Sequence, residues 1–231
     1  MKNKYSYVGI ALIVLLFGAF VVRNYKHHLE PRNRTTQEQK EEELNPSGLT
    51  YFEIDHKARK MPDFVFTDQN NQTISNVDYN GKVFVVEFFF TTCPSICPIM
   101  NRNMLTIEKE FGKRDDFGIA SFTINPTVDT PIKLKEYAEN YGVTSLNWHF
   151  LTGDRETIYE MANKGLNIFA ELNPEVEGGF EHQGFFALVD KNGFLRSRKD
   201  PYGNPKIYYQ GTDEKEVALL IEDIQLLLEN E

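Results

Sequence analysis

An almost unbroken apolar run near the middle of the chain sets the strongest limit on its fold. Residues 83–90, Val-Phe-Val-Val-Glu-Phe-Phe-Phe, are apolar at seven of eight positions. A strand of this composition is covered on both faces, as in the interior of a parallel sheet. The run therefore favours an α/β fold with a central sheet.

The segments around this run alternate between strand and helix. An apolar stripe at helical spacing extends from Met100 to Phe111 before Gly112, and Thr130-Pro131 is a typical helix start. Strands are expected over Asp63–Thr67, Lys82–Phe90, Phe117–Ile124, Trp148–Leu151, Phe185–Val189 and Phe194–Arg196, and further helices over Arg155–Lys164 and Asp213–Asn230. This order predicts a thioredoxin-like α/β sandwich with a central mixed β-sheet.

The N-terminus carries a candidate membrane anchor. Val8 to Val22 holds no polar side chain, and with residues 5–7 the run reaches eighteen residues, about 27 Å of helix against a hydrocarbon core of about 30 Å. Lys2 and Lys4 precede the run and no clean cleavage site ends it. We expect residues 1–22 to form one uncleaved transmembrane helix, with a cleaved signal peptide and a buried soluble helix as the alternatives. Residues 23–60 are then a polar tether and residues 61–231 the globular domain.

The charge balance bears on partners and on orientation. The formal net charge is −9, which argues against nucleic acid as a partner because binding nucleic acid requires a basic surface. Arg23, Lys26, Arg32 and Arg34 follow the anchor and outnumber the two lysines before it. Counted alone, these charges predict a cytoplasmic globular domain.

The chain has only two cysteines, Cys93 and Cys97. Two cysteines form no disulfide scaffold and supply too few ligands for a structural zinc site. They follow the buried strand at the start of a helix, where unpaired N–H groups favour a thiolate. A thiolate is both the nucleophile of disulfide exchange and a soft ligand for Cu(I). A purely structural disulfide between the two cysteines is the alternative, but a disulfide that closes so short a loop adds little to the stability of the folded protein.

A third ligand near the two cysteines would decide whether they bind a metal or carry out redox chemistry. His182 lies in a glycine-rich segment, Gly178–Gly184, that enters the Phe185–Val189 strand, and a thioredoxin-type fold places this loop beside the cysteine turn. The chemistry of the residues alone does not decide whether His182 is a metal ligand or has no role in the site. His149 alternates within a strand and is expected to be half-buried structure.

Several motifs occur in an order that resembles the SCO/SenC family. They are Glu87-Phe-Phe-Phe-Thr-Thr-Cys93-Pro-Ser-Ile-Cys97-Pro-Ile-Met100, Asn125-Pro126 with Asp129-Thr130-Pro131, Trp148-His149-Phe150-Leu151-Thr152-Gly153, and the loop histidine His182. The resemblance covers the chain from about Pro62 to its end.

This resemblance implies a membrane-anchored protein that binds copper and delivers it to the CuA centre of cytochrome c oxidase. The implied ligands are Cys93, Cys97 and His182, and the copper is Cu(I), Cu(II) or both. The implied partners are the CuA-bearing subunit and an upstream copper donor or thiol reductant. The resemblance also places the globular domain on the periplasmic or exoplasmic side of the cytoplasmic membrane, against the simple charge count.

Two further residues, Asp129 and Glu87, are candidates for supporting roles, and Asn125 departs from the family pattern. The family commonly has an aspartate where this chain has Asn125, whereas the downstream acid is present as Asp129, a candidate supporting residue behind the metal ligands. Thioredoxins have an acid six residues before their first active-site cysteine, and Glu87 occupies that offset here. A buried carboxyl has a raised pKa, so Glu87 is a candidate for proton exchange with the inner thiol.

An enzymatic function is the second hypothesis. In it, Cys93 and Cys97 form the redox-active pair of an extracytoplasmic thiol–disulfide oxidoreductase that keeps partner cysteines reduced, and His182 only modulates the thiolate. Whether the protein is an enzyme or a metallochaperone therefore stays open on the sequence.

Overall fold

The strand predicted from the apolar run lies inside the main sheet. In the computed structural model, which describes residues 15, 17 and 45–230, strand β6 (Val83–Phe89) is buried at all seven positions. It pairs with the parallel strand β7 (Phe117–Thr123) on one edge and with the antiparallel strand β11 (Phe185–Val189) on the other. Cover on both faces and both edges accounts for the apolar composition.

Among the described residues, the main sheet has seven strands in the order β1-β12-β11-β6-β7-β8, with β13 paired to β11 beside this path. Strands β6, β7 and β8 run parallel, and the other pairs are antiparallel. The remaining bounds are β1 (Thr50–Tyr51), β8 (Trp148–Leu151), β12 (Leu195–Ser197) and β13 (Tyr209–Gln210). The prediction of an α/β fold with a central mixed sheet is confirmed.

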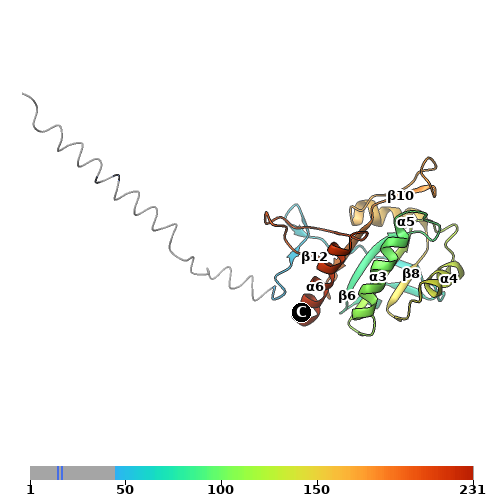
Figure 1. Cartoon of the computed structure of the whole chain (residues 1–231), viewed down its shortest axis with the longest axis horizontal. Helices are drawn as coiled ribbons and strands as arrows, with labels where there is room; N and C mark the ends of the chain where they lie inside the picture. Colours follow the sequence, from blue (N-terminus) through green and yellow to red (C-terminus); the bar gives the residue numbers. More distant parts are fainter. Residues whose placement is uncertain (1–14, 16, 18–44, 231) are drawn as a thin grey trace, which may run out of the picture. The chain divides into compact units, whose positions relative to one another are not determined.

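Three helices cover one face of this sheet. Helices α3 (Cys97–Phe111) and α6 (Glu214–Asn230) contact each other and lie in front of the sheet in Figure 1. Helix α4 (Pro131–Tyr141) packs beside α3, where the Asn101 amide donates a hydrogen bond to the Tyr137 hydroxyl at 3.0 Å. The predicted start of α4 is present, because the Thr130 hydroxyl accepts a hydrogen bond from a backbone N–H of the first turn.

The other face of the sheet is covered by aromatic side chains from a hairpin. Its strands are β4 (Val65–Thr67) and β5 (Thr73–Ser75), followed by the short 3₁₀ helix η1 (Asn76–Tyr79). The rings of Phe64 and Phe66 pack edge-on against Phe122 of β7. Aromatic packing therefore closes the core on this face.

The helix predicted over Arg155–Lys164 changes type along its length. It is α-helical over Arg155–Glu160 (α5) and continues as a π turn over Met161–Gly165 (η2). The Leu166 N–H bonds to the carbonyl of Met161, five residues back, which widens the turn. Side-chain periodicity does not distinguish one wide turn from an α-helical turn.

The compact unit begins earlier than the sequence indicates. It starts at Pro46, so residues 46–60 belong to it although the sequence assigns them to the tether. Leu49 and Phe52 are buried, and this segment forms β1, β2 (Glu53–Ile54) and β3 (Lys57–Ala58). Strands of two residues are too short to show a periodic pattern, which explains the difference.

The predicted anchor over residues 1–22 and the tether as far as residue 44 lie outside the described residues, apart from Leu15 and Phe17. Within the part of the chain that is described, no helix is both long enough and apolar enough to cross a membrane.

Candidate metal centre

The two cysteines lie between the end of β6 and the first turn of α3. Cys93 is in the connecting loop and is 9% exposed, whereas Cys97 is the first residue of α3 and is fully buried. Both are free thiols, and the Cys97 backbone N–H points at the Cys93 sulfur at 3.4 Å. The outer sulfur thus receives an N–H group from the helix N-terminus, which favours its thiolate form.

A histidine from a distant part of the chain completes the group. His182 is the last residue of β10 (Phe180–His182), which pairs with β9 (Ala170–Leu172) in a separate hairpin. Its Nε2 lies 3.3 Å from the Cys97 sulfur, 85 residues away in sequence. The ligand atoms of Cys93, Cys97 and His182 all lie within 4.8 Å of one another.

The orientation of the His182 ring is defined on two sides. Its Nδ1 lies 3.3 Å from the carbonyl oxygen of Gln183, and the ring packs edge-on against Phe90 with ring centroids 5.8 Å apart. A neutral imidazole that donates its Nδ1–H to that carbonyl keeps the Nε2 lone pair directed at the sulfurs. This tautomer is the one that a metal ligand at Nε2 requires.

The two thiols differ strongly in their tendency to ionise. The pKa of Cys93 is lowered to about 3, mainly by a hydrogen bond from the Cys97 thiol. Partial burial acts in the opposite direction and raises this pKa, whereas a hydrogen bond with His182 lowers it further. Burial raises the pKa of Cys97, and the hydrogen bond to Cys93 and its charge raise that pKa further. In the free pair, Cys93 is therefore the thiolate and Cys97 carries the proton.

A cavity of about 280 Å³ borders the group, and Cys93 and His182 form part of its wall. The rings of Phe90 and Phe180 and the side chain of Ile96 also line it. A second protein can therefore approach the outer sulfur and the imidazole from this side, while Cys97 stays covered.

A glycine allows the β9–β10 hairpin to close against the cysteine loop. Gly178 has a φ of +89°, and a Cβ there would lie 2.9 Å from Pro94 and 3.2 Å from Phe90. A larger residue at this position would be strained and would push the hairpin outward. This close approach keeps the strand that carries His182 beside the cysteines.

Asp129 fixes the cysteine loop from behind. It is fully buried and accepts hydrogen bonds from the Thr91 backbone N–H at 3.0 Å and from the hydroxyls of Thr91 and Thr123. Because Thr91 lies two residues before Cys93, the carboxylate holds the start of the loop to the end of β7. Asp129 thus contacts the loop backbone, and its supporting role behind the metal ligands stays a prediction.

Replacing this carboxylate should loosen the loop. In Asp129→Asn an NH₂ group faces hydroxyl and amide donors, so we expect the free energy of unfolding to fall by about 2 kcal/mol. Urea unfolding measures this loss. The matched control is Asn125→Asp, whose side-chain oxygen accepts from Thr127 and can still do so as a carboxylate. Equal losses in both variants would contradict the assigned role.

Glu87 is fully buried on β6, next to the cysteine loop. Its Oε1 accepts a hydrogen bond from the Ser121 hydroxyl at 2.6 Å, and Ser121 accepts one from the Trp148 indole at 2.9 Å. Its Oε2 is buried and has no hydrogen-bond partner in the described part of the chain. Burial raises the pKa of Glu87 to about 7, and its charge would raise the pKa of Cys97 further. Its exchange of protons with Cys97 stays a prediction.

The other histidine in a strand has a structural environment. His149 is half-buried on β8, as predicted, and its Nδ1 lies 2.8 Å from the Tyr79 hydroxyl. Burial lowers its pKa. In this position the ring stabilises the contact between η1 and the sheet.

Thr91, Thr123, Ser121 and Phe90 shape the site but carry no signal in the sequence. Threonine, serine and phenylalanine are ordinary strand residues. Each acts here through a partner on another segment, Asp129, Glu87 or His182. Only the spatial arrangement identifies them.

The comparison with known proteins now decides the family. Residues 53–214 match the family model described as SCO1/SenC, and this range includes both cysteines and His182. The chain belongs to the SCO1/SenC family. The family predicted from the order of the sequence motifs is therefore confirmed.

Relatives and solved structures agree with this assignment. The SCO1 protein homolog of Bacillus subtilis is 36% identical over 132 residues, which is 56% of this SCO1/SenC chain and 68% of that protein. One solved structure is that of BsSco, described as a member of the Sco family of cytochrome c oxidase assembly proteins with a disulfide switch. It has a TM-score of 0.62 and 30% sequence identity to this chain, and the match covers 75% of this chain and 96% of BsSco. Bradyrhizobium japonicum ScoI, solved with copper bound, shares the fold with a TM-score of 0.54 at 21% identity, over 74% of this chain and 99% of its own.

Proposed function

We propose that this SCO1/SenC protein binds one copper ion through Cys93, Cys97 and His182 and delivers it to the CuA centre of cytochrome c oxidase. The observation that carries the proposal is the group of two sulfurs and one imidazole nitrogen within 4.8 Å, bordered by an open cavity. Thiolates are soft ligands that select Cu(I), and imidazole is a common copper ligand.

The charge of this donor set suits a carrier. Two thiolates and Cu(I) together carry one negative charge, and a neutral imidazole adds none. With only three protein ligands, copper remains open to a ligand from a second protein, which can take over the ion by stepwise exchange. Delivery to cytochrome c oxidase is supported by the description of BsSco as an assembly protein of that enzyme, and copper as cargo by the copper-bound ScoI.

We place the globular domain outside the cytoplasmic membrane, held by residues 1–22 as a single-pass anchor. The apolar run of eighteen residues supports the anchor. An extracytoplasmic location would also allow the thiol pair to alternate between free and oxidised forms, because disulfides persist outside the cytoplasm.

Copper binding should require the reduced cysteine pair. We expect the full chain, reduced and held in detergent micelles, to bind one Cu(I) per molecule, and to bind none after oxidation to the disulfide, since a disulfide offers no thiolate. Competition with a Cu(I) chelator measures both states. Equal copper uptake by the oxidised and the reduced protein would contradict the proposal.

Thiol–disulfide exchange is a second candidate function. It is favoured by the contrast between the two thiols, an outer Cys93 with a lowered pKa and a covered Cys97 with a raised one. In this reaction the Cys93 thiolate attacks a disulfide of the partner and forms a mixed disulfide. Cys97 then releases the partner's second thiol, so the partner gains two electrons and the pair becomes oxidised. An external thiol reductant restores the pair.

A further inference from the structure

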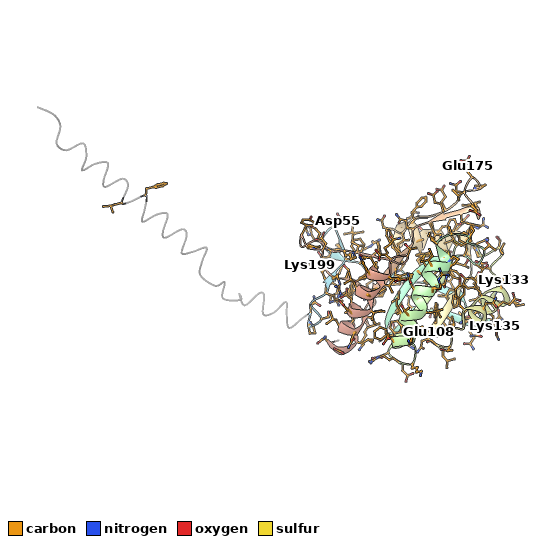
Figure 2. The ribbon with its side chains drawn as sticks, viewed as in Figure 1. Asp55, Glu108, Lys133, Lys135, Glu175 and Lys199 are labelled. Atoms are coloured by element: carbon orange, nitrogen blue, oxygen red, sulfur yellow. The ribbon has the colours of Figure 1, made fainter. Side chains whose placement is uncertain are left out.

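The β9–β10 hairpin beside the site has an unusual charge. Between Gly165 and Val189 the chain has four glutamates and no lysine or arginine. All four are exposed, and Figure 2 shows Glu175 at the outer edge of the molecule. We call Glu171, Glu175, Glu177 and Glu181 the acidic rim.

The fold itself does not favour this charge. Strand pairing places Glu171 directly opposite Glu181, and like charges in directly opposed positions destabilise a strand pair. Among the described residues, no lysine or arginine forms an ion pair with any member of the acidic rim. The cost is relieved when a positively charged surface approaches.

Two members of the acidic rim border an apolar floor that includes two of the candidate ligands. Glu177 and Glu181 line the same cavity as Cys93 and His182, together with Val176. On the same hairpin Leu172 is 46% exposed, and Phe169 just before β9 is 40% exposed. An apolar centre within a charged edge is the usual composition of a protein–protein interface.

We propose that the acidic rim docks the protein that exchanges copper with this site, and that this partner surrounds its own copper ligands with lysine and arginine. This inference rests on the proposed function and specifies the partner. Opposite charges at the edge of an interface increase the association rate and make it dependent on salt. A second copy of this chain would present the same acidic rim and would be repelled.

The test compares two variants that remove equal charge. The rim variant replaces all four rim glutamates with glutamine, and a smaller variant replaces only Glu175 and Glu177 in case the full one misfolds. The control variant removes four carboxylates near the other end of α3, which is about 20 Å long up to Glu110. Its substitutions are Glu110→Gln, Asp115→Asn, Glu139→Gln and Glu229→Gln.

The probes are two synthetic acceptor peptides with one Cys-x-x-Cys core, flanked by four lysines or by four glutamates. We expect the copper-loaded full chain to transfer copper to the lysine peptide about tenfold faster than to the glutamate peptide at low ionic strength. The ratio should fall towards one in the rim variant and at high ionic strength, and it should persist in the control variant. A ratio near one in the unmodified chain, or an unchanged ratio in the rim variant, overturns the inference.

A second measurement works without copper and separates this inference from the proposed function. The reduced chain is oxidised by cystamine, a cationic disulfide, or by dithiodipropionate, an anionic one. In each case the small disulfide gains two electrons while Cys93 and Cys97 form a disulfide. The rim variant should lower the cystamine rate relative to the dithiodipropionate rate by several fold, and the control variant should not. If this ratio changes as expected but the chain binds no copper, the proposed function fails and the acidic docking surface stands.

Discussion

His182→Ala should bind Cu(I) at least about 100-fold more weakly than the unmodified chain and still exchange disulfides. Losing a residue that only supports a metal ligand costs up to about 100-fold in affinity, so losing a ligand should cost at least that much. His182 lies 3.3 Å from the Cys97 sulfur through Nε2, and its removal leaves both thiols in place. Chelator competition gives the copper affinity, and the reaction with cystamine gives the exchange rate.

The same pair of measurements decides between the two candidate functions. His56→Ala is the control, because His56 is exposed and far from the cysteines in sequence. Wild-type copper affinity in His182→Ala would remove the imidazole from the ligand set. A large loss of exchange rate with unchanged copper affinity would instead favour the oxidoreductase.

Glu87→Gln should change the free energy of unfolding by about 3 kcal/mol more in the stabilising direction at alkaline pH than at acidic pH. Burial raises the pKa of Glu87 from 4.5 to about 7, so the folded protein holds a proton between these values that the unfolded chain has lost. The stability contributed by this proton is complete below pH 4.5 and is lost as the pH rises through 7. Glutamine does not ionise and avoids the loss, which is about 1.4 kcal/mol for each unit of pKa shift.

Urea unfolding at several pH values measures this difference. Trp148 is the only tryptophan of the chain and is linked to Glu87 through Ser121, so its fluorescence follows this part of the core. The exposed substitution Glu139→Gln is the control for the general pH dependence. A stability difference that stays constant from pH 4 to pH 9 would show that Glu87 is not a buried, pKa-shifted acid.

The same variant tests the predicted proton exchange with the inner thiol. The charge of Glu87 is one of the causes that raise the pKa of Cys97. Its removal should let Cys97 ionise at a lower pH, which the ultraviolet absorbance of the thiolate reports. An unchanged thiol titration in Glu87→Gln would remove the proton-coupling role while leaving the stability prediction intact.

Much of the fold was predictable because its elements have strong local signals. The apolar run gave β6 within one residue at each end, and Thr130-Pro131 marked the start of α4. The short strands β1, β2 and β3 and the hairpin of β9 and β10 were not predicted, because two or three residues form no readable period. Of these strands, β1 pairs with the distant strand β12, whereas β2 pairs with β3 and β9 pairs with β10.

The candidate ligands were predictable in a different way. Two cysteines after a buried strand indicate reactive thiols from local chemistry alone, whereas His182 was singled out by the family resemblance. The supporting residues Thr91 and Ser121 were not predictable, since their roles depend on hydrogen bonds to Asp129 and Glu87 from other segments of the chain.

Sequence alone was enough to predict the central strand, the position of two thiols at a helix start and the acidic character of the chain. These properties follow from the order of neighbouring residues and from composition. Tertiary packing was needed to show that the hairpin ending at His182 brings an imidazole to 3.3 Å from the inner sulfur and two glutamates to the adjoining cavity. Distances of this kind depend on how the hairpin packs against the cysteine loop, and that packing depends on contacts such as Gly178 against Pro94 that no local pattern encodes.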